Sequence, residues 1–235
     1  MPGPRGPTPA GFWQRAAAWS LDAVPVALLS LLATWPLLRP AAARLVTEGD
    51  PVLRMLAEAM ADALRGHAAG GVDLAGLPLA LLPAAIQGAE ALSGLVWGLL
   101  WPPLLAFALL SVLWHGLSEA SRWQASPGKR LLRLRVAGPR GAPLGPGRAL
   151  LRQLAGALSW LTLNLGHAMV LAGPEHRALH DRLSGTRVLA GRQGVPGWAR
   201  AWLVLAALGS FIAALALAGG LLARLQALLE QALWY

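Results

Sequence analysis

Long apolar blocks separated by charged segments dominate the pattern along the chain. The first block runs from 16 to 38, a second clear one from 94 to 117, and the last from 198 to 222. Each can cross a bilayer, which takes about 20 apolar residues in a helix. The first block is longer than a signal-peptide core and contains an acid, so we predict a retained span.

Two charged residues mark the first block. Asp22 lies inside it, and Arg15 lies seven residues earlier, on nearly the same helical face. An acid inside a span faces a partner or a water-filled cavity, because exposing it to lipid costs about 2.5 to 3.5 kcal/mol. We therefore expect a polar seam along this helix, in which the positive charge of Arg15 lowers the pKa of Asp22.

Residues 39–94 form a long connection with four basic and six acidic side chains. That balance suits the non-cytoplasmic side of a membrane, since cytoplasmic loops carry an excess of Lys and Arg. Within it, Leu53, Leu56 and Met60 fall on one helical face, and we predict an amphipathic helix over 51–66. This helix either lies on the membrane or covers the bundle.

The segment 118–152 is the most basic part of the chain, with eight basic side chains and one acid. It belongs in the cytoplasm by the same rule, and so does the N-terminus if two spans precede it. Leucine and valine alternate with arginine over 132–136, which predicts a strand. A glycine- and proline-rich turn follows, and 142–144 is the expected return strand of a small β-hairpin.

The apolar block 149–172 is interrupted near Asn164 and Gly166. A full span would place the following segment 173–200, with five basic and two acidic residues, outside. A re-entrant hairpin that breaks at Asn164 keeps both flanks in the cytoplasm, and Asn164 then offers a neutral oxygen at the break. Both readings stay open, with the hairpin favoured. Beyond it, 198–235 is expected to form a further apolar helix with an amphipathic tail.

Composition agrees with a membrane protein. Of 235 residues 56% are hydrophobic and only 13% charged, and there are no cysteines for disulfides or thiolate chemistry. The net charge of +9 flanks the apolar blocks, so topology and anionic lipid headgroups at a basic cytoplasmic face account for it without nucleic acid. Residues 1–10 are rich in proline and glycine, and we expect them to be disordered.

Three stretches in order resemble the RDD family of bacterial multi-pass membrane proteins. They are the opening run 11–22 (GFWQRAAAWSLD), the central run 126–131 (SPGKRL) and the closing run 177–186 (RALHDRLSGT). The resemblance covers roughly 12–189, which gives a membrane domain over 11–189 with 39–94 as an insert. The family is named for one arginine and two aspartates, which fall here on Arg15, Asp22 and Asp181.

What the resemblance implies is a membrane protein of poorly defined activity, for which transport is proposed; one family member is described as a sodium or potassium/proton antiporter. The charged trio is then either an ion or solute pathway or a network that holds the fold. The supporting motif residues are Ser126, Pro127, Gly128, Lys129, Arg130, Asn164, His180 and Arg182.

Other chemistry finds little support in the sequence. The run 126–130 lacks the earlier glycine and the hydroxyl residue of a phosphate loop, and no hydrolase, zinc-protease or dinucleotide motif is present. His176 and His180 beside Glu175 imitate a zinc site, but a third ligand is not evident. We therefore expect that the protein is not an enzyme and that it binds no metal and no cofactor.

We therefore predict an all-α integral membrane protein of a bacterial inner membrane with a cytoplasmic N-terminus. It is a helical bundle of three or four apolar segments, one of them re-entrant or spanning, with an amphipathic non-cytoplasmic helical insert and a small cytoplasmic β-hairpin. Transport of a small ion or solute through Asp22 is the first functional hypothesis, and a structural or interaction protein is the second. We expect a homo-oligomer, because self-association would help to bury Asp22.

Overall fold

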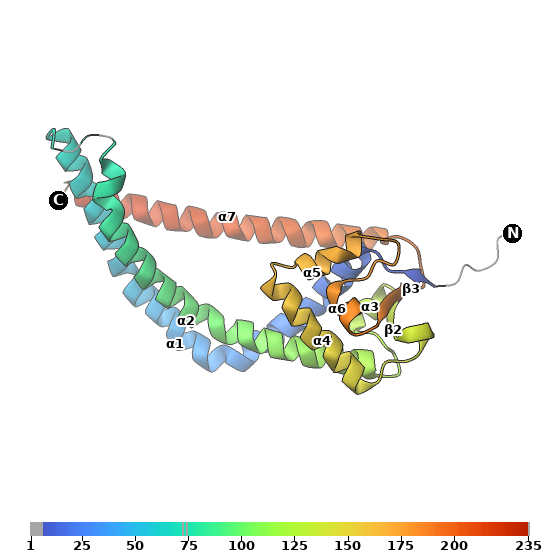
Figure 1. The fold of residues 1–235 in the computed structure, drawn as a ribbon. Helices are drawn as coiled ribbons and strands as arrows, with labels where there is room; N and C mark the ends of the chain where they lie inside the picture. The colour runs from blue at the N-terminus through green and yellow to red at the C-terminus, as the bar shows by residue number, and fades with distance from the viewer. Residues whose placement is uncertain (1–6, 72, 74, 235) are drawn as a thin grey trace. The chain divides into compact units, whose positions relative to one another are not determined.

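The computed structural model describes residues 7–71, 73 and 75–234. Long helices and a small sheet make up the chain (Figure 1). In order, the elements are β1 (Thr8–Pro9), α1 (Phe12–Ala68), α2 (Leu77–Ala120), α3 (Pro127–Leu131), β2 (Leu134–Ala137), η1 (Pro139–Gly141), α4 (Pro146–Leu161), α5 (Leu165–Ala168), η2 (Met169–Leu171), α6 (Leu179–Leu183), β3 (Arg187–Ala190) and α7 (Gly197–Trp234).

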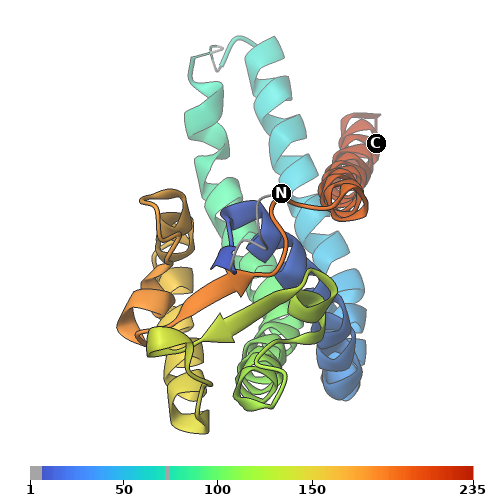
Figure 2. The same ribbon diagram turned by 90° about the vertical axis from the view of Figure 1, so that its right-hand side faces the viewer.

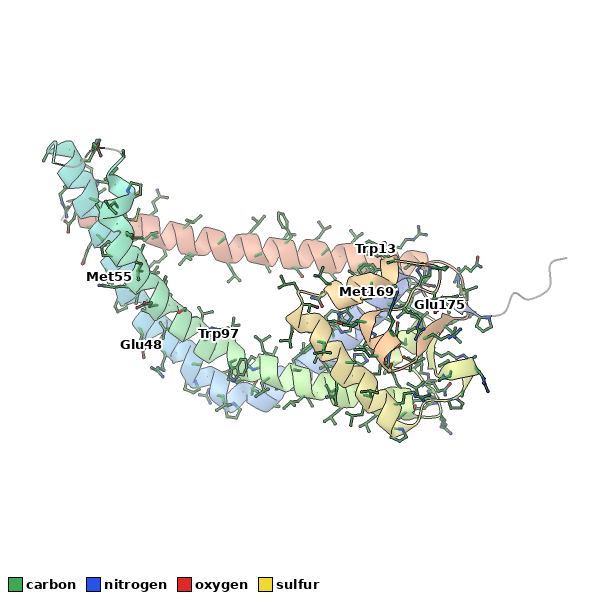
Figure 3. All side chains as sticks on the ribbon, in the orientation of Figure 1. Trp13, Glu48, Met55, Trp97, Met169 and Glu175 are labelled. Atoms are coloured by element: carbon green, nitrogen blue, oxygen red, sulfur yellow. The ribbon has the colours of Figure 1, made fainter. Side chains whose placement is uncertain are left out.

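Three of these helices are long and apolar enough to cross a membrane, and the bent pair of α4 with α5 and η2 adds a fourth if it counts as one span. The most apolar windows of α2 and α7 have no buried residue within the protein. Trp97, labelled on α2 in Figure 3, is one of many large apolar side chains left exposed. Such uniformly apolar, uncovered helices are typical of lipid-facing spans.

The chain divides into two compact units. The first combines Met1–Leu32 with Leu105–Ala207, and the second combines Ala33–Leu104 with Leu208–Tyr235. The predicted insert over 39–94 belongs to the second unit, but it is not a separate element. Its residues continue α1 as far as Ala68 and α2 from Leu77 onward, with a turn between the two helices.

The sequence prediction started a new helix at Asp50-Pro51, and this was wrong. A proline can sit within a long helix where the freed carbonyl finds other partners, and α1 runs through Pro40 and Pro51. Asp50 lies inside this helix, where its carboxylate accepts hydrogen bonds from Arg54 one turn along, at 3.2 Å, and from Arg224 of α7, at 2.7 Å. Within this unit α1 and α2 lie side by side, and Leu56 fills the space over Gly88 (Figures 1 and 2).

The first unit contains a three-stranded antiparallel sheet in the order β1-β3-β2. Leu134 pairs with Ala190 and Ala137 with Arg187, while Thr8 pairs with Ala190 from the other side. Figure 2 shows β2 and β3 side by side and pointing in opposite directions. The chain is therefore mostly helical, as predicted, and its small β structure is a three-stranded sheet in place of the predicted hairpin.

Two local predictions are corrected by this sheet. The alternation over 132–136 does give a strand, but its partner is β3 rather than 142–144, so there is no local hairpin. The segment 1–10 was expected to be disordered. Residues 1–6 lie outside the described part of the chain, whereas Thr8 and Pro9 form β1 and Ala10 is fully buried.

The core of this unit is built largely from small side chains, which let the sheet, the start of α1 and α4 approach closely. Three leucines and two valines from the sheet region and from the turn before α4 complete it. The buried cluster is Ala10, Ala17, Ala18, Leu132, Leu134, Val136, Leu144, Ala149, Val188, Ala190 and Ala199. This packing brings Asp22, the loop before α3 and α6 into one compact body.

Candidate functional site

Asp22 is buried in the first unit with 1% of its surface exposed. Three neutral donors surround its carboxylate: the Ser126 hydroxyl donates to Oδ2 at 2.5 Å, the Gly128 amide to Oδ1 at 2.8 Å, and the Trp114 indole to Oδ1 at 3.1 Å. Among the described residues, no basic side chain forms an ion pair with it. The charge of Asp22 is thus met by hydrogen bonds rather than by a counter-charge.

The central motif positions these donors through its small residues. Pro127 opens α3, where a missing backbone N–H costs nothing, and the chain then turns so that Gly128 faces α1. A Cβ on Gly128 would collide with the Ala18 carbonyl and lie 2.9 Å from Asp22 Oδ2. Only glycine lets the backbone come this close, so Ser126 and Gly128 form a cradle for an acid carried by α1.

Arg15 does not pair with Asp22, which corrects the predicted seam. Its guanidinium reaches Asp181 of α6 at 2.5 Å, the His176 carbonyl at 2.5 Å and the Ala10 carbonyl at 3.0 Å. The two acids of the trio therefore sit in different environments. Asp181 has arginines around it, and Asp22 has neutral donors.

Asp181 is fully buried and is the centre of an ion network. Arg15 and Arg152 both donate to its carboxylate, and so does the amide of Ala178, at 3.0 Å. Burial disfavours the ionised carboxyl, but the positive charges of Arg152 and Arg15 outweigh it and hold the pKa of Asp181 well below its usual range.

Glu119, at the end of α2, extends the same network. It is 1% exposed and accepts hydrogen bonds from Lys129 Nζ at 2.8 Å, Arg152 Nε at 3.0 Å and Gln153 Nε2 at 3.0 Å. Arg152 on α4 is buried and bridges Glu119 and Asp181. Three positive side chains (Arg15, Lys129, Arg152) thus pair with two acids (Glu119, Asp181) in the interior of one unit, and Asp22 stays outside this network.

Sequence reasoning missed Glu119, Arg152 and Trp114. A signal existed for two of them. Glu119 is the single acid in an otherwise basic segment, and Arg152 lies on the small-residue face of α4, three residues from both Ala149 and Ala155. An isolated charge of unusual sign, or a charge on a face of alanines, indicates a buried partner.

The remaining motif residues are more peripheral. Lys129 enters the network, but Arg130 lies over the Trp123 ring and Arg182 is exposed, donating only to the Arg177 carbonyl. His180 stacks at 5.1 Å from His167, and burial together with Arg152 lowers its pKa well below the usual value. Glu175, labelled in Figure 3, pairs with Arg177. Within the described residues, no three His, Asp or Glu side chains are grouped to hold a metal.

The predicted break in the fourth apolar block is present. Helices α4 and α5 meet at an angle of 113°, and both Leu163 and Asn164 have left-handed backbone conformations. Asn164 contributes to the break through its backbone. Its backbone N–H donates to the Ser159 carbonyl at 2.7 Å, and its backbone carbonyl accepts from the N–H groups of His167 and Ala168. The Ser159 hydroxyl is buried behind Gly166. Met169, at the start of η2, follows the break (Figure 3).

Membrane-length apolar helices joined to a buried ion network define a multi-pass α-helical membrane protein. Residues 9–185 match the model of the RDD family, and the chain belongs to this family. The uncharacterized protein YxaI of Bacillus subtilis (strain 168) is 35% identical over 88 residues, covering 37% of this chain and 58% of that protein. The match thus spans little more than half the length of that relative. No solved structure matches the chain.

Proposed function

We propose that this protein is a transporter, or a component of one, for a small ion or solute in the bacterial inner membrane, with Asp22 as the acid that exchanges a proton or a cation. The observation that carries this proposal is the environment of Asp22. A buried carboxylate in a long apolar helix, held by neutral donors and paired with no cation of the described residues, can change its charge without breaking an ion pair seen there.

The cradle couples that charge to the loop. An ionised carboxylate accepts all three hydrogen bonds, whereas a protonated one becomes a donor at one oxygen and loses acceptor capacity. Protonation of Asp22 would therefore weaken its hold on Ser126 and Gly128. Because Lys129, the next residue, pairs with Glu119, a shift of this loop also reaches the ion network. Exchange of sodium or potassium against protons is the form of transport that this chemistry suits.

The sheet supports an orientation for the chain. Strands β1, β2 and β3 come from before α1, after α2 and before α7, and they pair in one sheet, so these three segments share one side of the membrane. The segment from α4 to η2 starts and ends on that side, which favours the re-entrant reading over a full span. Since the most basic segment lies there, we assign that side to the cytoplasm.

The test is cation-dependent proton flux in proteoliposomes. Wild type is compared with Asp22→Asn and with a control at an exposed acid, Glu58→Gln, and folding is checked by size exclusion. Transport through Asp22 predicts flux in wild type and in the control and none in the folded Asp22→Asn protein. Ser126→Ala, which keeps the acid but removes one donor, should retain flux with an altered pH dependence.

A second candidate is a non-transporting structural or interaction protein. The fully buried network of Glu119, Arg152 and Asp181 favours it, since such networks fix one arrangement of their elements. In that case wild type gives no flux under any cation gradient, and Asp22→Asn lowers thermal stability instead. Either result of the flux assay therefore decides between the two candidates.

A further inference from the structure

A basic pocket of about 290 Å³ opens beside the sheet, on a part of the molecule that the ion network does not use. Its walls come from the loop before α3, from β2 and from the turn after β3. Its lining includes Trp123, Gly191 and three arginines, which are Arg130, Arg133 and Arg135. No acidic residue lines it.

The three arginines of this pocket are unlike the buried cations of the chain. Arg15, Lys129 and Arg152 each have a carboxylate partner, whereas within the described part of the chain no hydrogen bond or ion pair engages the guanidiniums of Arg130, Arg133 or Arg135. Three unpaired guanidiniums around one hollow repel each other unless an anion joins them. A guanidinium offers a planar fork of donors, which matches the oxygens of a phosphate group.

Local structure holds the side chain of Arg130 and the backbone of Arg133 in place. The Arg130 guanidinium lies 4.3 Å from the centroid of the Trp123 ring, with Arg122 at 5.5 Å from the same ring. Arg133 has a left-handed backbone, φ 54°, and its carbonyl accepts the Gly191 amide at 2.9 Å. A non-glycine residue in this conformation is unfavourable, and such strain gathers at sites that need one particular geometry.

We propose that this pocket is a binding site for a phosphate group, carried either by the headgroup of an anionic lipid or by a free phosphorylated compound. The surroundings suit the lipid, because Trp123 and Leu131 beside the pocket are exposed apolar side chains at the expected membrane boundary. This site is separate from the cradle of Asp22 and does not depend on transport.

The test is calorimetric titration of the full-length protein in detergent with three probes: dihexanoyl phosphatidylglycerol, glycerol 3-phosphate and dihexanoyl phosphatidylcholine. We expect the wild type to bind the first. The variant Arg133→Gln/Arg135→Gln should weaken that binding by about tenfold or more, because each charged hydrogen bond lost costs about a factor of ten. The matched control Arg140→Gln/Arg148→Gln removes two exposed charges from the same segment outside the pocket and should change it by less than about twofold.

The three probes separate the sources of the phosphate. Tighter binding of phosphatidylglycerol than of glycerol 3-phosphate assigns the pocket to lipid, and equal or tighter binding of glycerol 3-phosphate assigns it to a soluble ligand. The zwitterionic phosphatidylcholine should bind more weakly than phosphatidylglycerol. The proposal is overturned if neither anionic probe binds, or if the two double variants weaken binding equally, because diffuse charge would then explain the affinity.

Discussion

The missing side chain of Gly128 decides how the central motif meets the first helix. We expect Gly128→Ala to lower stability by about 1–3 kcal/mol, the usual cost of overpacking, because its Cβ would press on the Ala18 carbonyl and the Asp22 carboxylate. Thermal unfolding in detergent measures this. Gly147→Ala, on α4 with open space around it, is the matched control and should be neutral or stabilising. An equal loss in both variants would show that the cradle is not tightly packed.

The charge of Asp181 gives a pH dependence with a definite sign. Its pKa is lowered in the folded protein, so its contribution to stability is full above the pKa of the unfolded carboxyl, about 4, and is lost as the pH falls below it. At pH 7 we expect Asp181→Asn to cost roughly 3–5 kcal/mol, as breaking a buried ion pair does. The unfolding midpoints of the two proteins should stay apart down to about pH 4 and converge only as the pH falls further, toward the lowered pKa of Asp181 in the folded protein.

An exposed acid provides the control for this effect. Asp62 pairs with Arg65 on the surface of α1, and Asp62→Asn should change the midpoint little at any of these pH values. If the difference between wild type and Asp181→Asn did not shrink as the pH fell from about 4 to about 2, the ionised carboxylate of Asp181 would not be what stabilises this region.

At the scale of single residues, the sequence identified the charged trio of Arg15, Asp22 and Asp181 but not the contact partner of each. Arg15 and Asp22 share a helical face, yet a face says nothing about a partner that arrives from α6, 166 residues later. The partners of Glu119 and Arg152 were hidden for the same reason: an unusual charge indicates that a partner exists, but only the packing of α2, α4 and α6 shows which one it is. The motifs point to the trio in the sequence, and the three-dimensional arrangement divides it between the cradle of Asp22 and the ion network of Asp181.

Among the elements, the broken segment from α4 to η2 was the most predictable, because Asn164 tolerates the left-handed conformation that a sharp break needs. We expect Asn164→Ala to lower stability by about 1 kcal/mol and Asn164→Gly to leave it nearly unchanged, since only alanine has a Cβ that opposes this backbone. Thermal unfolding of the two variants in parallel checks the prediction. Equal midpoints would mean that the break does not depend on this residue.

The strands show where element prediction stopped. Alternating residues over 132–136 identified β2. The two residues of β1 are too few for a periodic signal, and β3 has three apolar residues in a row after Arg187 instead of an alternation. Because a turn follows directly at 138–141, the sequence favoured the segment after it as the partner of β2. The error for the first long helix was the opposite one: the sequence analysis ended the apolar block at residue 38 and predicted a separate helix over 51–66, although α1 continues through both segments.

For the whole molecule, the sheet predicts which loops lie on the same side of the membrane. Because the sequence contains no cysteine, each cysteine introduced by substitution is the single site for thiol labelling. Single substitutions Arg140→Cys and Gln193→Cys should react with a membrane-impermeant maleimide only after the cells are opened. Ala69→Cys, in the turn between α1 and α2, and Gln231→Cys, near the end of α7, should react in intact cells. Labelling of Arg140→Cys in intact cells would contradict the proposed orientation.

The reason given for self-association no longer holds, although the oligomeric state itself stays a prediction. A polar helix in a thin bundle was expected to need a second copy to cover Asp22. The single chain already buries this residue under Trp114, Ser126 and Gly128. Any oligomer must therefore form for a different reason.

The pairing of Thr8 with Ala190 sets an order on biosynthesis. As the ribosome makes this chain, the first two long helices can enter the bilayer while β1 has no neighbour, because its partner strand is made some 180 residues later. Arg15 likewise cannot form its ion pair until Asp181 has been synthesised. Formation of the sheet is thus a late step that requires every earlier segment to have been delivered to the correct side. A nascent chain inserted in the wrong orientation could not complete it, and it would expose unpaired arginines to the cell's proteases.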